Sequence, residues 1–324
     1  MKKKFWSVML VIALLGVAGC LGFIAWHIFS DMGAQQVYEE TVELVTHPRD
    51  ESTPVDESEE EEDVGESGLT VADIESVEFT GEREGEEAPL PADIFSGLGS
   101  RVDFNLLMDI NPDLYAWLLV NDTNIDYPVA QHPTDDYFYL NHDMYGEPRF
   151  AGCPYTQLAN KMDFSDPNTV IYGHNMKSGS MFSTLHYFED ADFFNTHPYI
   201  YVYTQDKILV YETFAARFFT DDNVLTAYNY FEDEKSFQQF LDDIYNNRSM
   251  RNNIRSDFEV TTKDRILTLS TCVGGSPEER FLVHAKLMWE GSESELEEAQ
   301  RKIEEGILES QAAENTVPEA TTEG

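Results

Sequence analysis

Between about residue 100 and residue 290, the chain alternates short apolar runs with polar breaks. The runs are rich in β-branched and aromatic residues, and Asn, Asp, Pro and Gly separate them, which is typical of short strands joined by turns. One long segment, residues 232–247, has helical character, and a short helix and turn is predicted over residues 101–115. Many short strands with few helices favour a mostly β domain, a closed antiparallel barrel. The predicted strands are residues 116–120, 124–129, 150–155, 169–173, 200–204, 207–216, 265–272 and 280–287.

The longest uninterrupted apolar run lies at the N-terminus. Residues 5–29 carry no charged side chain, and as a helix they would extend about 37 Å, enough to cross a bilayer. Three lysines precede the run and acidic residues follow it. This pattern predicts a single-pass transmembrane helix in the cell membrane, with a cytoplasmic N-terminus and the rest of the chain outside. Two alternatives remain, a cleaved signal peptide and a lipoprotein signal that ends at Cys20.

Two acidic segments flank the strand-rich region. Residues 31–99 contain a run of four Glu and one Asp and have few large apolar residues, which is typical of a disordered, self-repelling stalk. Residues 291–324 form the second segment, in which residues 293–308 have the composition of a polar helix. The net charge of −40 argues against nucleic acid as a partner, because phosphate binding needs basic surface. The predicted organisation is an anchor (1–30), a stalk (31–99), a catalytic domain (100–290) and a tail (291–324).

Cysteine is rare, and its positions narrow the chemistry. The three thiols are Cys20, Cys153 and Cys272, so the exported part has only one possible internal disulfide, whereas disulfide-stabilised exported domains normally have several. At least one thiol is therefore expected to serve by its reactivity. Cys153 is interpreted as an inert, half-buried thiol or as a partner for Cys272 under oxidation. Since no Cys/His spacing suits zinc and no glycine loop suits a phosphate or dinucleotide, no metal or cofactor is expected.

Cys272 and Arg280 stand at the facing ends of two predicted strands, joined by a connection with turn composition. A thiolate is a strong nucleophile, and nearby positive charge favours the thiolate over the thiol. An Arg offers fixed hydrogen-bond donors to an oxyanion. His174 follows Gly173 at another strand end, where an imidazole can project from the rim and act as an acid or base. The alternatives are a buried Cys beside a surface Arg, and a structural His. The other histidines of the domain, in loops or inside a strand, are interpreted as structural: His132, His142, His186, His197 and His284.

These residues stand in motifs that resemble a known enzyme family. Tyr172-Gly-His-Asn-Met176, then Thr268-Leu-Ser-Thr-Cys272, then Arg280 are similar in order and flanks to sortases, and the Leu-Ser-Thr-Cys form after a long helix resembles class B. The resemblance covers about residues 100–290. It implies a β-barrel cysteine transpeptidase that needs no cofactor. In this family pattern Cys272 is the nucleophile, His174 is the general acid and then the base, and Arg280 is the donor to the oxyanion.

The resemblance also implies a reaction and its partners. A sortase cleaves a sorting motif near the C-terminus of a secreted protein after a Thr, holds the acyl group as a thioester and transfers it to an amine of a cell-wall precursor. Two other functions stay open, a pilus-polymerising enzyme that uses a pilin Lys as the amine and a non-catalytic barrel that only binds surface proteins. The run 153–160 departs from the family pattern because Gln157 and Ala159 replace charged residues, so the sorting motif and the acceptor amine are not predicted.

Overall fold

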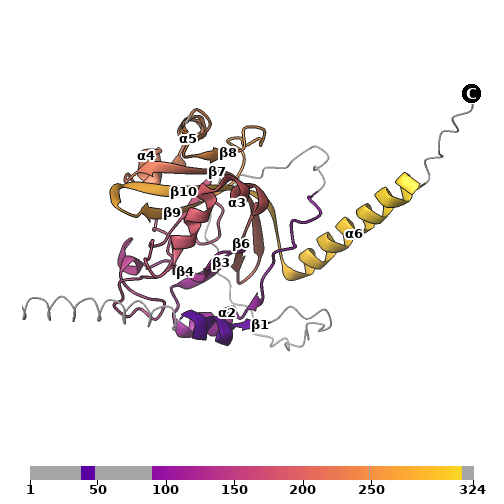
Figure 1. Cartoon of the computed structure of the whole chain (residues 1–324). Coiled ribbons are helices and arrows are strands. Elements are labelled where there is room, and N and C mark those ends of the chain that lie inside the picture. Colours follow the sequence, from indigo (N-terminus) through magenta and orange to yellow (C-terminus); the bar gives the residue numbers. More distant parts are fainter. Residues whose placement is uncertain (1–37, 48–89, 248, 316–324) are drawn as a thin grey trace, which may run out of the picture.

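A computed structural model describes residues 38–47, 90–247 and 249–315, and a curled β-sheet is its central element (Figure 1). The strands of the sheet lie in the order β4-β3-β6-β7-β10-β9-β5, and the short strand β8 pairs with β7. A separate ladder joins β1 to β2. The strands are β1 (Thr46–His47), β2 (Arg101–Val102), β3 (Leu114–Val120), β4 (Ile125–Ala130), β5 (Asn168–Tyr172), β6 (Tyr199–Thr204), β7 (Ile208–Thr220), β8 (Asn253–Ile254), β9 (Ile266–Val273) and β10 (Ser276–Gly291).

Helices fill the connections between the strands. The predicted long helix is found as α5, Glu234–Tyr245, which begins where the Asp233 side chain accepts a hydrogen bond from the Ser236 amide. Its buried residues Phe237, Phe240, Leu241 and Ile244 recur at helical spacing and form one apolar stripe. The others are α2 (Phe104–Ile110), α3 (Ala191–Thr196), α4 (Val224–Ala227) and α6 (Glu293–Asn315), with the 3₁₀ turns η1 (Phe138–Leu140), η2 (Phe182–Glu189) and η3 (Asn229–Phe231).

The two faces of the sheet bury different apolar clusters, as β10 illustrates. Phe281 and Val283 belong to the large interior core, whereas Leu282 between them belongs to a second cluster that includes the stripe of α5. This alternation follows from the two-residue period of a strand. Arg280, two residues before Leu282, therefore lies on the helix-covered face. Figure 1 shows α4 and α5 against this face.

The prediction of a closed, wholly antiparallel barrel is wrong. β5 pairs with β9 in parallel, and β4 and β5 are the two ends of the strand order. Only single bridges from Tyr155 to Ala130 and to Tyr172 join these ends, so the sheet is a curled, incompletely closed half-barrel. The predicted strand 150–155 reduces to this bridge. Gly152 there has φ +64°, and a Cβ at its position would lie 2.5 Å from the Tyr139 carbonyl oxygen, so the chain turns where a strand would have to continue.

The predicted membrane-spanning helix is not among the described elements. Among the residues that the structure describes, no helix combines the length and the apolar character needed to cross a bilayer. The segment for which it was predicted, residues 5–29, lies outside the described residues.

Parts of the predicted stalk pack against the domain. Residues 38–45 are helical, and Tyr38 and Val45 are buried in the interior core together with Ile94. The Tyr38 hydroxyl donates a hydrogen bond of 2.7 Å to the Gly152 carbonyl oxygen. The folded unit therefore includes residues 38–47 and 90–99.

Candidate active site

The parallel pair β5–β9 brings two of the predicted site residues to one edge. Tyr172 is aligned with Ser270, and the Gly173 amide donates to the Ser270 carbonyl oxygen at 3.0 Å. The next residue of the first strand is His174, and two residues beyond Ser270 is Cys272. Because the strands run in the same direction roughly 5 Å apart, both residues emerge at the same end of the sheet.

The antiparallel pair β9–β10 adds the third predicted residue. Cys272 and Arg280 are directly opposite each other, so their side chains project on one face with Cβ atoms roughly 5 Å apart. The Cys272 side chain is exposed. One nitrogen of the Arg280 guanidinium donates to the carbonyl oxygens of Pro277 (2.9 Å) and Glu279 (3.1 Å). The connection between the strands thus holds the guanidinium at the rim.

His174 lies between solvent and the loop that carries η1. Its Nε2 is 2.7 Å from the Leu140 carbonyl oxygen, which can only accept, so this nitrogen carries the hydrogen. The Phe150 ring stacks on the imidazole with centroids 5.4 Å apart. Burial lowers the pKa of His174, and the hydrogen bond to Leu140 opposes that shift. The imidazole is therefore predominantly neutral near pH 7, as a base must be.

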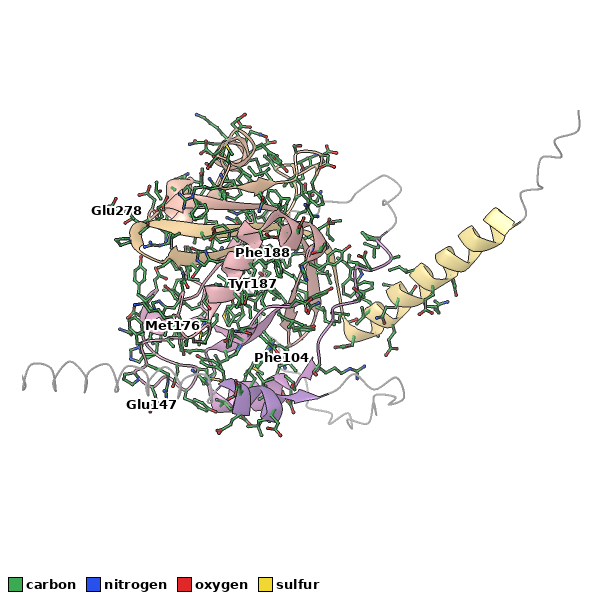
Figure 2. The ribbon with its side chains drawn as sticks, viewed as in Figure 1. Phe104, Glu147, Met176, Tyr187, Phe188 and Glu278 are labelled. Carbon is green, nitrogen blue, oxygen red and sulfur yellow. The ribbon has the colours of Figure 1, made fainter. Side chains whose placement is uncertain are left out.

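The three side chains lie at one rim of the sheet. Within residues 38–47, 90–247 and 249–315, no hydrogen bond joins the Cys272 thiol to the His174 imidazole or the Arg280 guanidinium. Figure 2 labels Met176, just after His174, and Glu278, in the turn between Cys272 and Arg280, on the same side of the domain. The sequence correctly paired Cys272 with Arg280 across a strand turn. That His174 joins them through a parallel strand was not predicted.

Tyr155 is a neighbour of this rim that the sequence did not single out. It is 6% exposed and stacks on Tyr172 with centroids 5.5 Å apart. Burial raises the pKa of Tyr155, the charges of Tyr137 and Cys272 raise it further, and that of Arg280 lowers it. The phenol therefore lies within electrostatic reach of the candidate nucleophile and the guanidinium.

The departure from the family pattern at Gln157 has a structural role. Its side-chain oxygen accepts from the Asn223 amide at 2.6 Å and from the Tyr172 hydroxyl at 3.2 Å. Asn223 is the N-cap of α4, so these contacts tie the loop after β7 to the segment that bridges the sheet edges. A neutral amide suits this position because it accepts from two uncharged donors.

Asn175 and His186 contact the backbone of Cys272. The sequence did not single out Asn175, and His186 was interpreted as structural. The Cys272 carbonyl oxygen accepts from Asn175 Nδ2 at 2.9 Å and lies 3.1 Å from His186 Nε2. His186 was set aside because no nucleophile was near it in the sequence. The signal that would have found it is three-dimensional, since η2 returns the chain to the end of β9.

Cys153 is buried well inside the domain. It is 3% exposed, its sulfur lies 3.6 Å from the Pro128 carbonyl oxygen, and both it and Cys272 are free thiols. Burial raises the pKa of the Cys153 thiol far above its ordinary value. This matches the interpretation of an inert thiol.

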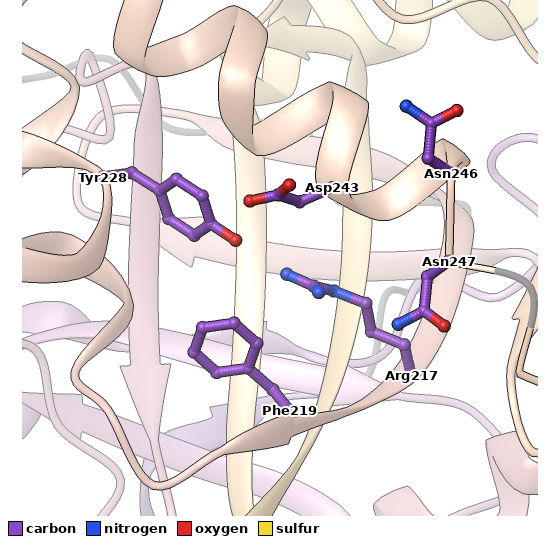
Figure 3. A pocket seen from close by; sticks show the side chains of 6 residues that line it. All are labelled: Arg217, Phe219, Tyr228, Asp243, Asn246 and Asn247. Carbon is purple, nitrogen blue, oxygen red and sulfur yellow. The ribbon is translucent and has the colours of Figure 1, made fainter.

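A surface pocket of about 360 Å³ lies between α5 and β7 (Figure 3). Arg217, which is 2% exposed, points from β7 toward Tyr228 and Asp243, and its Nε donates to the buried His284 at 3.1 Å. The residues that line the pocket are Arg217, Phe219, Tyr228, Asp243, Asn246 and Asn247. His174, Cys272 and Arg280 are not among them. In the described part of the chain, no group of three or more His, Cys, Asp or Glu is placed to hold a metal ion.

The sequence and the fold match known proteins. The family model described as the sortase domain matches residues 118–288. Sortase B of Listeria monocytogenes is 36% identical over 172 residues, which cover 51% of this chain and 65% of that protein, just under two thirds of its length.

Two solved structures share the fold. The Clostridium perfringens sortase B structure matches with a TM-score of 0.52 and 31% identity, covering 58% of this chain and 100% of that one. The Staphylococcus aureus sortase B–substrate complex matches with a TM-score of 0.50 and 32% identity, covering 57% and 84%. The chain therefore belongs to the sortase family of cysteine transpeptidases, and within it to class B.

Proposed function

We propose that this sortase cleaves a C-terminal sorting motif after a Thr and transfers the acyl group to an amine of the cell wall, with Cys272 as nucleophile. The observation that carries the proposal is the register of three strands. β5 ends opposite Ser270 of β9, which sets His174 beside Cys272, and β10 sets Arg280 opposite Cys272.

In the first half of the reaction, the Cys272 thiolate attacks the carbonyl carbon of the scissile peptide bond. The carbonyl electron pair moves onto oxygen, and the Arg280 guanidinium donates to this oxyanion after leaving the Pro277 and Glu279 carbonyls. The thiolate forms when the Cys272 thiol gives its proton to the neutral His174 imidazole. When the C–N bond breaks, His174 passes this proton to the departing amine, and a thioester remains on Cys272.

In the second half, a primary amine of the acceptor attacks the thioester. His174, now neutral, takes the proton that the amine loses, and the thiolate leaves as the new amide forms. The lowered pKa of His174 supports the role of base, because the neutral imidazole is available near pH 7. Transfer outruns hydrolysis when the acceptor is held close to the thioester.

Peptide binding is the part of the proposal that a relative supports. The S. aureus sortase B structure is a complex with substrate. We extend peptide recognition to this chain and place the peptide along the exposed rim beside Tyr155. Action at the outer face of the cell membrane is also part of the proposal, and it is supported only by the charge pattern of the N-terminal sequence.

A peptide library with mass readout tests the proposal. The full chain is incubated with peptides that vary around a central Thr, with and without a small primary amine, and products are identified by mass. We expect cleavage after Thr, a new amide when the amine is present, and a thioester adduct on the peptide that contains Cys272. Turnover that persists in Cys272→Ala would contradict the assignment.

A further inference from the structure

The Cys272 carbonyl lies in the part of β9 that extends beyond the end of its neighbour β5. On the β5 side of β9, alternate residues direct their backbone groups toward β5, and the Ser270 carbonyl accepts the Gly173 amide. Cys272, two residues on, faces the same side, but β5 has ended at Tyr172. Its carbonyl would therefore have no partner from the sheet, and two side chains take the place of the missing strand.

Those side chains come from two segments that lie apart in the sequence. Asn175 Nδ2 donates to the Cys272 carbonyl oxygen at 2.9 Å, and His186 Nε2 lies 3.1 Å from the same oxygen. The two nitrogens are themselves 3.0 Å apart. The Cys272 carbonyl, the Asn175 side-chain amide and the His186 imidazole thus each contact the other two.

The orientation of His186 is fixed from behind. Its Nδ1 lies 2.5 Å from a carboxylate oxygen of Glu189, which makes Nδ1 the protonated donor. Its ring stacks on Phe281, next to Arg280 in β10, with centroids 5.0 Å apart. Figure 2 labels its neighbours Tyr187 and Phe188 in the middle of the domain, where η2 crosses the sheet.

Hydrogen counting shows that this arrangement holds the carbonyl in either charge state of the imidazole. When His186 is neutral, its Nε2 lone pair accepts one N–H of Asn175, and the other N–H of Asn175 serves Cys272. When it is protonated, Nε2–H donates to Cys272 directly. In both states Glu189 keeps Nδ1–H.

From these contacts we infer that Asn175, His186 and Glu189 are positioning residues that fix the peptide of the nucleophile against the segment of the general base. Asn175 directly follows His174, so its hydrogen bond to the Cys272 carbonyl sets the spacing of the His174 and Cys272 side chains. The inference rests on the proposed function for its effect on rate. The physical claim, that these side chains hold the end of β9, stands independently.

The first test separates rate from binding. We expect Asn175→Asp, which replaces the donor by an acceptor facing the carbonyl, and His186→Leu each to lower kcat about tenfold or more, with KM changed less than threefold. His186→Gln, whose amide can still donate, should recover most of the loss. Because Glu189 acts through His186, Glu189→Gln should lower kcat two- to fivefold alone and have no effect in His186→Leu.

The matched control is His197→Leu. His197 is also a partly exposed His with a carboxylate partner, Asp122 at 3.1 Å, and it stacks on Phe193, but it does not contact Cys272. We expect it to keep wild-type kcat. Losses of similar size in His197→Leu, an unchanged kcat in Asn175→Asp, or additive effects of Glu189 and His186 would overturn the inference.

A second readout does not depend on activity. Amide hydrogen exchange followed by mass spectrometry reports local opening of the segment 268–276. We expect exchange there to be at least about fivefold faster in Asn175→Asp and His186→Leu than in the wild type and His197→Leu. Unchanged exchange would refute the positioning role even if the enzyme is active. If exchange is faster in Asn175→Asp and His186→Leu but turnover persists in Cys272→Ala, the proposed function is refuted and the positioning role is retained.

Discussion

The domain has a Cys and a His at its rim and another Cys and His in its interior, and the contrast shows what makes such residues chemically useful. At the rim, Cys272 is exposed, and His174 is half-buried with one nitrogen on a carbonyl. In the interior, Cys153 is 3% exposed and His284 is fully buried. The same residue types are thus available for reaction at a strand end and locked in their neutral forms in the core.

The interior His284 shows how the locking works. Arg217 Nε donates to its Nε2 at 3.1 Å, its Nδ1 lies 2.9 Å from the Thr268 hydroxyl, and that hydroxyl donates to the Asn168 side-chain oxygen at 2.8 Å. Since Arg217 can only donate, Nε2 of His284 must be unprotonated. Burial, reinforced by the charge of Arg217, lowers the pKa of His284 well below its ordinary value.

Replacing each of the two cysteines by alanine gives the largest expected difference. Cys272→Ala should lower the transpeptidation rate by roughly 10³-fold or more, because no nucleophile remains. Cys153→Ala should stay within about twofold of the wild type. The rates are measured by mass spectrometry of a cleaved peptide. A large loss in Cys153→Ala would break the contrast between the two sites.

Arg280→Lys tests whether the rim needs a guanidinium or only a positive charge. An ammonium cannot reproduce the fixed fork of donors, so we expect kcat to fall by roughly 10²-fold. Arg251→Lys is the matched control, because Arg251 stacks on Phe218 and pairs with Glu279 in the same connection. Equal effects of the two substitutions would argue against oxyanion stabilisation.

Alkylation compares the thiols directly. In the native full chain we expect iodoacetamide to modify Cys272 roughly 100-fold faster than Cys153, because only an accessible thiolate reacts. Peptide mapping at timed intervals assigns the modified residue, and urea should make the two rates similar. Rapid native modification of Cys153 would mean that the interior opens far more readily than its burial implies.

The pH dependence of stability tests the interior histidine. An unfolded His takes up a proton near pH 6.5, whereas folded His284 does not until much lower pH, so the unfolded state binds more protons below 6.5. The contribution of His284 to the free energy of unfolding should therefore be constant above pH 6.5. As the pH is lowered below 6.5, this contribution should decrease by up to about 1.4 kcal/mol per pH unit. Half-buried His174 adds in the same direction. Urea unfolding at pH 7.5 and 5.5 measures this, and His284→Gln should show a shallower dependence. An identical slope in that variant would assign the effect elsewhere.

The smallest effect is expected for the stability of the interior thiol. Cys153→Ala removes a buried sulfur and should lower the free energy of unfolding by about 1 kcal/mol, whereas Cys272→Ala should leave it within about 0.5 kcal/mol. Urea unfolding of both variants at pH 7.5 provides the comparison. A reversed order would mean that the rim is the better packed of the two regions.

Local patterns predicted most elements but not how they join. The apolar runs around residues 116–120, 200–204 and 265–272 became strands β3, β6 and β9, and residues 232–247 became α5. The direction of β5 was missed, because its apolar run reads the same for parallel and antiparallel pairing. The partners of Cys272 were missed for a related reason. Asn175 and His186 reach it across 97 and 86 residues of sequence, and no local period encodes that contact.

The buried contact between Tyr38 and Gly152 has a practical consequence for anyone expressing fragments of this enzyme. A truncated protein that starts at residue 100 would lack the hydroxyl that binds the Gly152 carbonyl, two residues from the ring that stacks on His174. It would also uncover the core positions now filled by Val45 and Ile94. Truncated versions should therefore start before Tyr38.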